Sequence, residues 1–439
     1  MLQFEDSSSW LYQIGQQSLR TYELLRDQVV NMRLREAIPA VIAGSTQLGV
    51  VTPLVEPCLS SSISILCINQ YASVMPYHFF RPSRNRTGWS STFGSSYISN
   101  DPLFSQVDNA DFLVFDRQRG FELLGTSPSY EYIFEVPKNV HEAPVYVSTQ
   151  NKLYISRLTP GYLPQLVLDL NEDPPTISEY LSDPPVYAPN GGTIHNGLIY
   201  WGASGGINSI GGTEQRPGVR VLDLATNKSV ELLNNYFGYF FNCIDDLVVH
   251  PNGDIWFTDP NYSWYNKLSD VPPQLAAATY RFRPSTGAVS IVEDTLAEPN
   301  GIAFSPDSKI LYISDTGAVS GLVTGKVSQG QSYSHLGKKT VYAFDVSDDA
   351  TYLTNKRPIY LAQQHCPDGL KVARNGYVLT ATGMGVDILD STGTLLVRVQ
   401  TNYTVQNFAW AGNDFKEFWM MGEGGISRVR WELQGQELK

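Results

Sequence analysis

At six places along this chain of 439 residues, a polar residue of one narrow type opens a short apolar strand. These openers are Glu142, Asn190, Asp245, Asn300, Asp368 and Asn407. Each stands eight to eleven residues before a second strand of leucine, isoleucine, tyrosine or tryptophan, and these second strands recur roughly every 41 to 67 residues. Strand pairs that repeat at this period predict a β-propeller. If each opener begins the innermost strand of a blade, six polar side chains converge at one mouth of the central channel.

A second family of strand-like segments repeats in phase with the openers and would supply the outer strands of each blade. Its members are FLVFD (112–116), LVLDL (166–170), VRVLDL (219–224), TYRFRP (279–284), VYAFDV (341–346) and VDILD (386–390). The first precedes the first opener, and the last opener is followed by only two strands. We therefore expect 112–116 to pair into the final blade and close the ring. The predicted fold is all-β, a six-bladed propeller.

Residues 1–105 differ from the rest and are predicted to form an N-terminal extension. An amphipathic helix is expected over 10–35, where apolar residues recur at helical spacing, followed by loop-rich and partly disordered chain. Residues 106–439 are predicted to be the catalytic propeller domain. The role of the extension and the oligomeric state are left open.

Charge and apolar patterning exclude some partners. The net charge of −12 without a basic cluster argues against nucleic acid and anionic membrane surfaces, because phosphate binding needs concentrated lysine and arginine. No apolar stretch is long enough to span a bilayer. The chain shows no secretion signal from Met1, but a start at Met32 would produce a weak one, so secreted and cytoplasmic locations both stay open. The four cysteines show no metal pattern and allow one disulfide, Cys58 to Cys67.

The openers carry carboxylate and amide oxygens and no histidine or cysteine, a donor set that selects a hard cation. Calcium is the leading ion, and another divalent cation such as magnesium is the alternative. The predicted ligands are Glu142, Asp245, Asn300 and Asp368, which would bring three negative charges to one ion. Those charges would repel one another in an empty site.

Several segments resemble the senescence-marker/gluconolactonase family of calcium-dependent six-bladed propellers. They are HEAPVYV (141–147), LLNNYFGYFFNCIDDLVVHPNGDIWFTDP (232–260), EPNGIAFSPDSKILYISDTG (298–317) and CPDGLKVARNGYVLTATGMGV (366–386). The fungal lactonohydrolases of this family share LLNNYFG and the PNGGT of residues 189–193. The resemblance covers about residues 110–439 and implies hydrolysis of a small lactone, such as an aldonolactone, a pantolactone-like ring or a secondary-metabolite lactone.

By motif position, Glu142 matches the glutamate ligand of the family, Asn300 the asparagine of PNG, and Asp368 the aspartate of PDG. The fourth position is usually asparagine in an NDV or NDL motif, but here it is Asp245, followed by Asp246. The extra charge could tighten calcium binding or provide a base, and it puts the usual substrate preference in question.

The chemistry predicted from these residues is hydrolysis without a covalent nucleophile. The ion would polarise the lactone carbonyl, while Asp245 or Asp368 takes a proton from the attacking water. Four further residues are candidates for substrate contact, namely Asn190, Asn407, His141 and His365. For the two histidines, packing at the rim is the commoner role.

Three alternatives were weighed against this interpretation. Ser204 lies in a formal GxSxG, but the glycine-rich loop after it cannot be the helix that a nucleophile elbow opens. The same propeller could instead carry a non-hydrolytic isomerase or cyclase, because a fold does not fix a reaction. It could also serve only as a binding platform. Acid release from a lactone panel separates these functions.

Overall fold

The computed structural model describes residues 54–59, 63–69, 79–80, 96–98, 101–140, 142–207, 210–212 and 214–438. The helix predicted over 10–35 and the candidate residue His141 lie outside this described part. One compact unit runs from Pro53 to Lys439.

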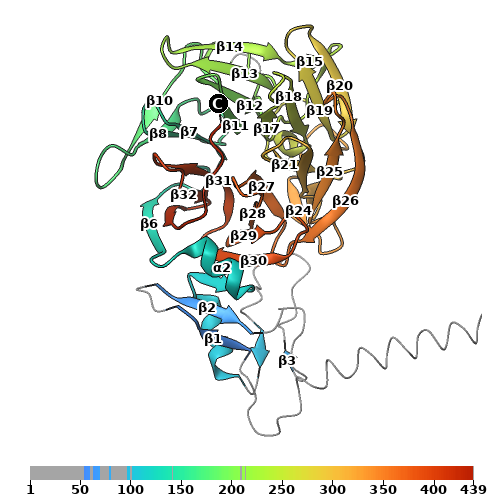
Figure 1. The fold of residues 1–439 in the computed structure, drawn as a ribbon. Coiled ribbons are helices and arrows are strands. Elements are labelled where there is room, and N and C mark those ends of the chain that lie inside the picture. The colour runs from blue at the N-terminus through green and yellow to red at the C-terminus, as the bar shows by residue number, and fades with distance from the viewer. Residues whose placement is uncertain are drawn as a thin grey trace, which may run out of the picture. The chain divides into compact units, whose positions relative to one another are not determined.

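Six groups of strands in chain order make up the ring (Figure 1). The first is β7 (Glu142–Val147), β8 (Lys152–Ser156), β9 (Gln165–Asp169) and β10 (Thr176–Tyr180). The second is β11 (Pro189–His195), β12 (Leu198–Ala203), β13 (Gly218–Asp223) and β14 (Lys228–Leu233). The third is β17 (Leu247–Val249), β18 (Ile255–Asp259), β19 (Ala278–Arg283) and β20 (Ala288–Glu293). The fourth is β21 (Pro299–Phe304), β22 (Ile310–Asp315), β25 (Thr340–Val346) and β26 (Leu353–Leu361). The fifth is β27 (Pro367–Val372), β28 (Val378–Thr382), β29 (Gly385–Leu389) and β30 (Leu395–Gln400). The last is β31 (Val405–Ala411), β32 (Glu417–Gly422), β33 (Gly425–Arg430) and β6 (Ser129–Glu135).

Short elements lie outside these groups. They are β1 (Val55–Pro57), β2 (Ile65–Ile68), β3 (Phe79–Phe80), β4 (Tyr97–Ile98), η1 (Pro102–Asn109), β5 (Phe112–Val114), α2 (Arg117–Leu124), β15 (Asn235–Tyr236), β16 (Tyr239–Phe240), η2 (Ile210–Gly212), α3 (Tyr262–Tyr265), β23 (Val319–Gly321) and β24 (Gln331–Tyr333). None of the helices in the described residues is long and apolar enough to cross a membrane.

The inner strands contact one another in a closed circle, β7 to β11, β17, β21, β27, β31 and back to β7. This arrangement confirms an all-β propeller with the openers at its centre. The prediction of six separate four-stranded blades needs correction. Five sheets are four-stranded blades, whereas β27–β30 form part of a seven-stranded sheet that continues through β5, β2 and β1. A disulfide joins Cys58 to Cys67 next to this extension of the sheet, as the sequence allowed.

The ring closes through β6, which pairs antiparallel with β33. The prediction that 112–116 closes the final blade is therefore wrong, because β5 pairs with β30 of the neighbouring sheet instead. Glu131 of β6 reinforces the closure by accepting bonds from Arg428 at 2.7 Å and Arg430 at 3.0 Å. The strand that immediately precedes the first inner strand in sequence thus completes the last blade.

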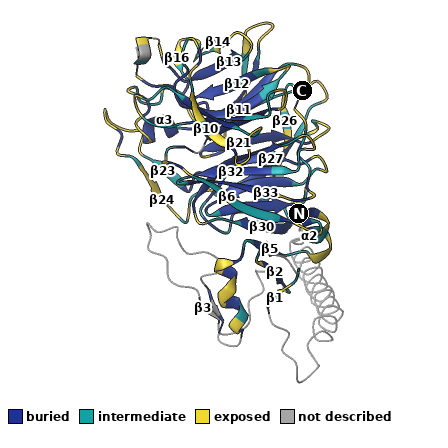
Figure 2. Ribbon diagram, turned by 90° about the vertical axis from the view of Figure 1, so that its left-hand side faces the viewer, coloured by how far each residue is buried: buried dark blue, intermediate teal, exposed yellow. Residues whose placement is uncertain are grey.

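Turn chemistry and packing explain why the strands form where they do. The turns between the first and second strands of three groups place Gly253, Ser308 and Gly376 at positive φ, the conformation that tight hairpin turns demand. The apolar faces of adjacent groups pack against each other; one cluster, for example, joins Tyr154 of β8 to Trp201 of β12. Figure 2 shows strands such as β12, β32 and β33 largely in dark blue, the colour of buried residues.

Candidate functional site

Local irregularities at the starts of the inner strands redirect the openers. The pairing of the first and second strands shifts register beside Glu142, Asn190, Asn300, Asp368 and Asn407. A bulge of this kind turns a side chain away from its regular direction and is common beside active sites. Asp245 stands two residues before β17 and bonds through its backbone N to Thr258 O at 3.0 Å. All six openers therefore lie at the same end of the ring.

The glycine after an opener allows the next inner strand to approach. A Cβ on Gly301 would lie 2.6 Å from Asp368 O, and one on Gly369 would lie 2.7 Å from the Asn407 side chain. Any residue larger than glycine would push the neighbouring opener outward. The PNG and PDG tripeptides thus make close contact possible between openers that are distant in the chain.

Hydrogen bonds link openers of different groups directly. Asn407 Nδ2 donates to Glu142 Oε2 at 2.9 Å, and Asn300 Nδ2 lies 3.4 Å from Asp245 Oδ2. The Asn300 side chain also bonds to Asp368. Within this cluster of openers, hydrogen bonds thus join Asn407 to Glu142 and Asn300 to Asp245 and Asp368.

The second strands hold this cluster in place. Thr258 Oγ1 donates to Asn300 O at 2.6 Å, and Ser314 Oγ donates to Asp368 O at 2.8 Å. In each case a hydroxyl of one group fixes the opener of the next. Asp259, at the end of β18, accepts from the backbone N of Cys243 at 2.8 Å and so orders the loop before Asp245. This contact gives Asp259 a structural role.

The acidic openers are buried beside one another. Glu142 is 5 % exposed and Asp245 is 3 % exposed, whereas Asp368 keeps more of its surface accessible. Burial, and then the charge of Asp368, raise the pKa of both Glu142 and Asp245 well above the usual range. Burial raises the pKa of Asp368 to about 7. The carboxylates thus behave as mutually repelling neighbours.

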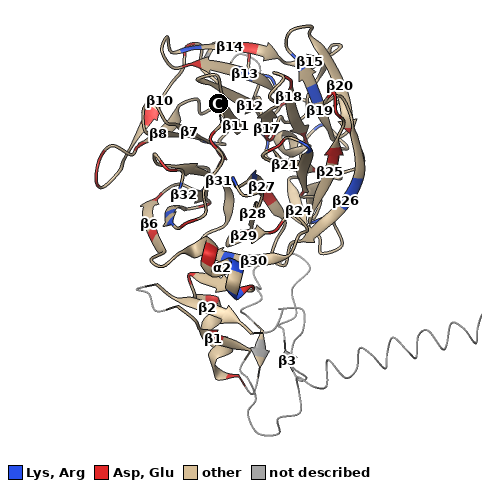
Figure 3. Cartoon of the chain, in the orientation of Figure 1, with Lys and Arg blue, Asp and Glu red and all other residues tan. Residues whose placement is uncertain are grey.

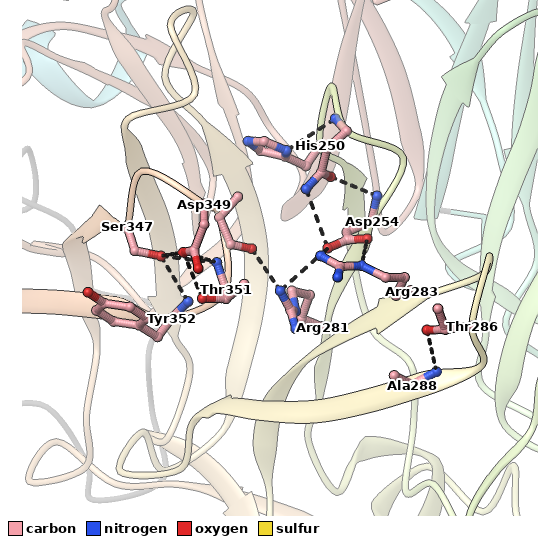
Figure 4. Close-up of polar contacts among 12 residues, drawn as sticks. His250, Asp254, Arg281, Arg283, Thr286, Ala288, Ser347, Asp349, Thr351 and Tyr352 are labelled. Atoms are coloured by element: carbon pink, nitrogen blue, oxygen red, sulfur yellow. Dashed lines mark hydrogen bonds and ion pairs between the residues drawn. The ribbon is translucent and has the colours of Figure 1, made fainter.

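A buried carboxylate elsewhere in the ring shows the contrast (Figure 4). Asp254 accepts two bonds from Arg283, at 2.9 and 2.8 Å, and lies 3.5 Å from Arg281. Arg281 also donates to Ala350 O in the next group. Burial tends to raise the pKa of Asp254, but the two arginines bring it below its ordinary value. Asp254 is a compensated structural acid, whereas no arginine among the described residues forms an ion pair with Glu142, Asp245 or Asp368.

The donor set of the openers fits a hard divalent cation in its chemistry. Among the described residues, however, no three His, Cys, Asp or Glu side chains form a ready metal cluster. Lys371 pairs with Asp246, the neighbour of the opener Asp245, at 3.3 Å. Sequence reasoning noted Asp246 only as part of a motif and missed Lys371, since no local signal connects two residues so far apart in the chain.

The four residues predicted to contact substrate differ in their surroundings. Asn407 Nδ2 donates to Glu142 Oε2, and Asn407 Oδ1 accepts from the backbone N–H of Phe408. Asn407 therefore positions the Glu142 carboxylate. Asn190 is buried, with Nδ2 3.6 Å from Cys243 Sγ. His365 stacks on Tyr333, with 5.5 Å between ring centres, and burial lowers its pKa to about 4. His141 cannot be placed.

Ser204 lacks the partners of a catalytic serine. Its Oγ accepts from Cys243 Sγ at 3.5 Å, and between Ser204 and β13 the described residues form only the three-residue helix η2. This geometry agrees with the rejection of a serine-hydrolase mechanism.

Two different structures occupy the two ends of the channel. On the opener side, α3 and the β23–β24 hairpin form part of a roof, which we define as residues 203–207, 210–212, 214–218, 261–276 and 317–338. Trp264 Nε1 joins α3 to the hairpin by donating to Leu322 O at 3.2 Å. At the other end lies a cavity of about 490 Å³ lined by the ends of the inner strands and by residues 436–438. Figure 2 shows α3 and the hairpin on one side of the strands and the C-terminus on the other.

Comparison with known proteins identifies the family. A sequence model described as the SMP-30/Gluconolactonase/LRE-like region matches residues 197–326 and 334–422. The chain is 46 % identical over 389 residues to Lactonohydrolase oryL of Aspergillus oryzae, covering 88 % of this chain and 89 % of that protein. The chain belongs to the SMP-30/gluconolactonase/LRE-like family.

Two further likenesses agree with this placement in the SMP-30/gluconolactonase/LRE-like family. Lactonohydrolase oryH of Aspergillus oryzae is 41 % identical over 88 % of this chain and 95 % of its own length. The solved structure of a gluconolactonase from Xanthomonas campestris superposes with a TM-score of 0.58 at 24 % identity, covering 73 % of this chain and 94 % of that one. The structural likeness concerns the fold.

Proposed function

We propose that this protein is a lactonase that hydrolyses the ester of a small lactone ring at the opener mouth, using calcium. Two relatives of high coverage are named lactonohydrolases. The observation that carries the proposal is the convergence of buried carboxylate and amide oxygens without arginine partners at one end of the ring. We also count β27–β30 as the sixth blade, which gives the six-bladed arrangement implied by the family resemblance.

Calcium would be held by Glu142, Asp245, Asn300 and Asp368. When bound, it would supply polarisation of the lactone carbonyl and compensation of the carboxylate charges. The protein's contribution is to keep the four oxygen-bearing side chains close before binding. Asn407 holds Glu142 through its side-chain amide. The hydroxyls of Thr258 and Ser314 hold Asn300 and Asp368 by donating to their backbone carbonyls.

Asp368 is the preferred proton acceptor. It is more accessible than Asp245, and a carboxylate that water can reach is a suitable general base. A carboxylate oxygen of Asp368 would take a proton from water as the water oxygen attacks the carbonyl carbon. The bond from that carbon to the ring oxygen then breaks, and the proton passes to the released alkoxide. The product is the open hydroxy acid, and no covalent enzyme intermediate is needed.

Asn190 is the remaining candidate for a hydrogen bond to substrate, because its amide has only a long contact to sulfur at 3.6 Å. The neutral His365 is assigned to packing, since its ring stacks on Tyr333. The substrate class is an aldonolactone, a pantolactone-like ring or a larger secondary-metabolite lactone.

Acid release tests the proposal. Purified protein, stripped with EGTA and then supplied with calcium, is offered glucono-δ-lactone, pantolactone and a series of larger lactones in a pH-stat. Calcium-dependent acid release above the spontaneous rate is expected for at least one of them, and Asp368→Asn is the matched inactive control. Conversion without acid release would indicate an isomerase or cyclase instead, and complete inertness with no calcium binding would indicate a binding platform.

A further inference from the structure

Lys371 occupies an unusual position on the inner strand β27. It lies three residues after Asp368, and its Nζ is 3.3 Å from Asp246 Oδ2. The lysine side chain is 19 % exposed and the aspartate side chain 1 %. Lys371 also lines the cavity at the opposite end of the channel. Its ammonium group therefore reaches from that cavity toward the end of the channel that carries the acidic openers Glu142, Asp245 and Asp368, which we call the acidic mouth.

Asp246 is held rigidly beside a proposed calcium ligand. Its Oδ1 accepts from Leu247 N at 2.9 Å, and its backbone O accepts from Thr258 N at 3.0 Å. Asp246 follows Asp245 directly, and its charge is among the causes that raise the pKa of Asp245. A cation bonded to Asp246 consequently lowers the negative potential at Asp245 as well.

The charge balance around the ring makes this single cation important. Four acids, Glu142, Asp245, Asp246 and Asp368, lie at the starts of three inner strands, β7, β17 and β27. In the described part of the chain, Lys371 is the one basic residue that forms an ion pair with any of them. Figure 3 shows a basic segment on β27 close to the centre of the ring. Removing one partner of a buried ion pair leaves the other charge uncompensated, which is strongly destabilising.

We propose that Lys371 is a positioning residue that serves as an internal counter-cation for the acidic mouth. It stabilises the folded ring while no divalent cation is bound and, because like charges repel, weakens the binding of that cation. The second half of this inference rests on the calcium site of the proposed function. The first half requires only the contacts of Lys371 and Asp246.

The test is Lys371→Met, which keeps most of the stem and removes the charge. In EGTA, we expect the melting temperature to fall by about 5 °C. In saturating calcium, the fall should be much smaller, since the bound ion compensates the acids. Isothermal titration with calcium chloride should show binding tighter by about tenfold.

Three controls separate charge from packing. Lys371→Arg retains the charge and should recover most of the stability in EGTA. Lys228→Met removes an exposed partner of Asp183, with side chains 61 % and 66 % exposed, and should change neither quantity. Adding Asp246→Asn to Lys371→Met removes both charges and should restore much of the lost stability.

An equal fall with and without calcium, with unchanged calcium affinity, would mean that Lys371 only packs, and would overturn the inference. If the natural protein binds no calcium, the calcium part of the proposed function and the predicted gain in affinity both fail. The double variant then decides the rest: recovery of stability in EGTA supports the counter-cation, and absence of recovery refutes it.

Discussion

The two ends of the central channel are built by the same six inner strands but have opposite chemistry. At their starts, these strands present buried carboxylates and amides under a roof of loops. At their ends, they present mainly apolar side chains, such as Ile194, Phe304 and Trp410, around a cavity of about 490 Å³ closed partly by the C-terminal residues. This cavity is therefore not where the reactive groups converge.

The difference shows that, within one channel, a cavity and the polar groups suited to catalysis can lie at opposite ends. Apolar side chains at strand ends fill the ring and stabilise it, whereas bulges at strand starts aim polar groups at a common point. The Lys371–Asp246 pair lies at the boundary between the two ends. Substitutions on either side should consequently have different effects, and these can be measured.

The largest difference is expected for Asp368→Ala. This change removes a proposed calcium ligand and the proposed proton acceptor, so turnover should fall by about 10³-fold or more. Calcium binding, followed by titration calorimetry, should also be lost. Glu437→Gln, which removes a carboxylate at the opposite end, is the matched control and should leave both unchanged. Full activity of Asp368→Ala would disprove the assignment of the site.

Asp245→Asn should have the next largest effect and sharpen the role of charge at the acidic end. It restores the asparagine usual at this position in the family and removes one negative charge. Calcium affinity should fall by about tenfold, while turnover at saturating calcium is retained. In EGTA, the variant should be more stable by about 1 kcal/mol, because repulsion from Asp246 and Asp368 is relieved. A less stable metal-free variant would contradict the repulsion inferred from the raised pKa of Asp245.

Sequence could predict the acidic end because its signals repeat. Six openers in phase with six second strands fixed the blade order, and PNG or PDG marked the close approaches at Asn300 and Asp368. The closing strand could not be predicted. Segments 112–116 and 129–135 both look like strands, and only the completed ring shows that the second pairs with β33.

Other parts of the site depend on contacts between distant residues. The pairing of Lys371 with Asp246 joins positions 125 residues apart, and no spacing rule indicates it. The role of Asn407 also follows from a distant partner, Glu142, rather than from its own surroundings in sequence. The cavity at the opposite end arises from apolar residues that resemble any buried strand.

His365→Asn tests whether a histidine contributes to the chemistry of the acidic end. Asparagine suits the positive φ of 51° at this position. Because burial lowers the pKa of His365 to about 4, the unfolded chain binds its proton at a higher pH than the folded chain does. This residue therefore costs stability as the pH falls from about 6.5 to 4, by up to about 3 kcal/mol.

In His365→Asn, this acid-dependent part of the loss should disappear from urea unfolding curves. A stability change from lost stacking on Tyr333 would be independent of pH and can be subtracted. The pH dependence of turnover between 6 and 8 should stay the same, since the ring is already neutral there. A profile that shifts with the substitution would show that His365 transfers protons after all.

Removal of residues 436–439 probes the opposite end and should have the smallest effect. Gln436 Nε2 donates to Val372 O at 2.9 Å and lies 3.5 Å from Phe304 O, so it ties the ends of two inner strands together. Its loss should lower the free energy of unfolding by about 1 kcal/mol, and Gln436→Ala alone should reproduce most of that change. Turnover and calcium affinity should stay within twofold, because the acidic end keeps all its contacts. A loss of turnover beyond tenfold in the shortened chain would show that the two ends work as one site.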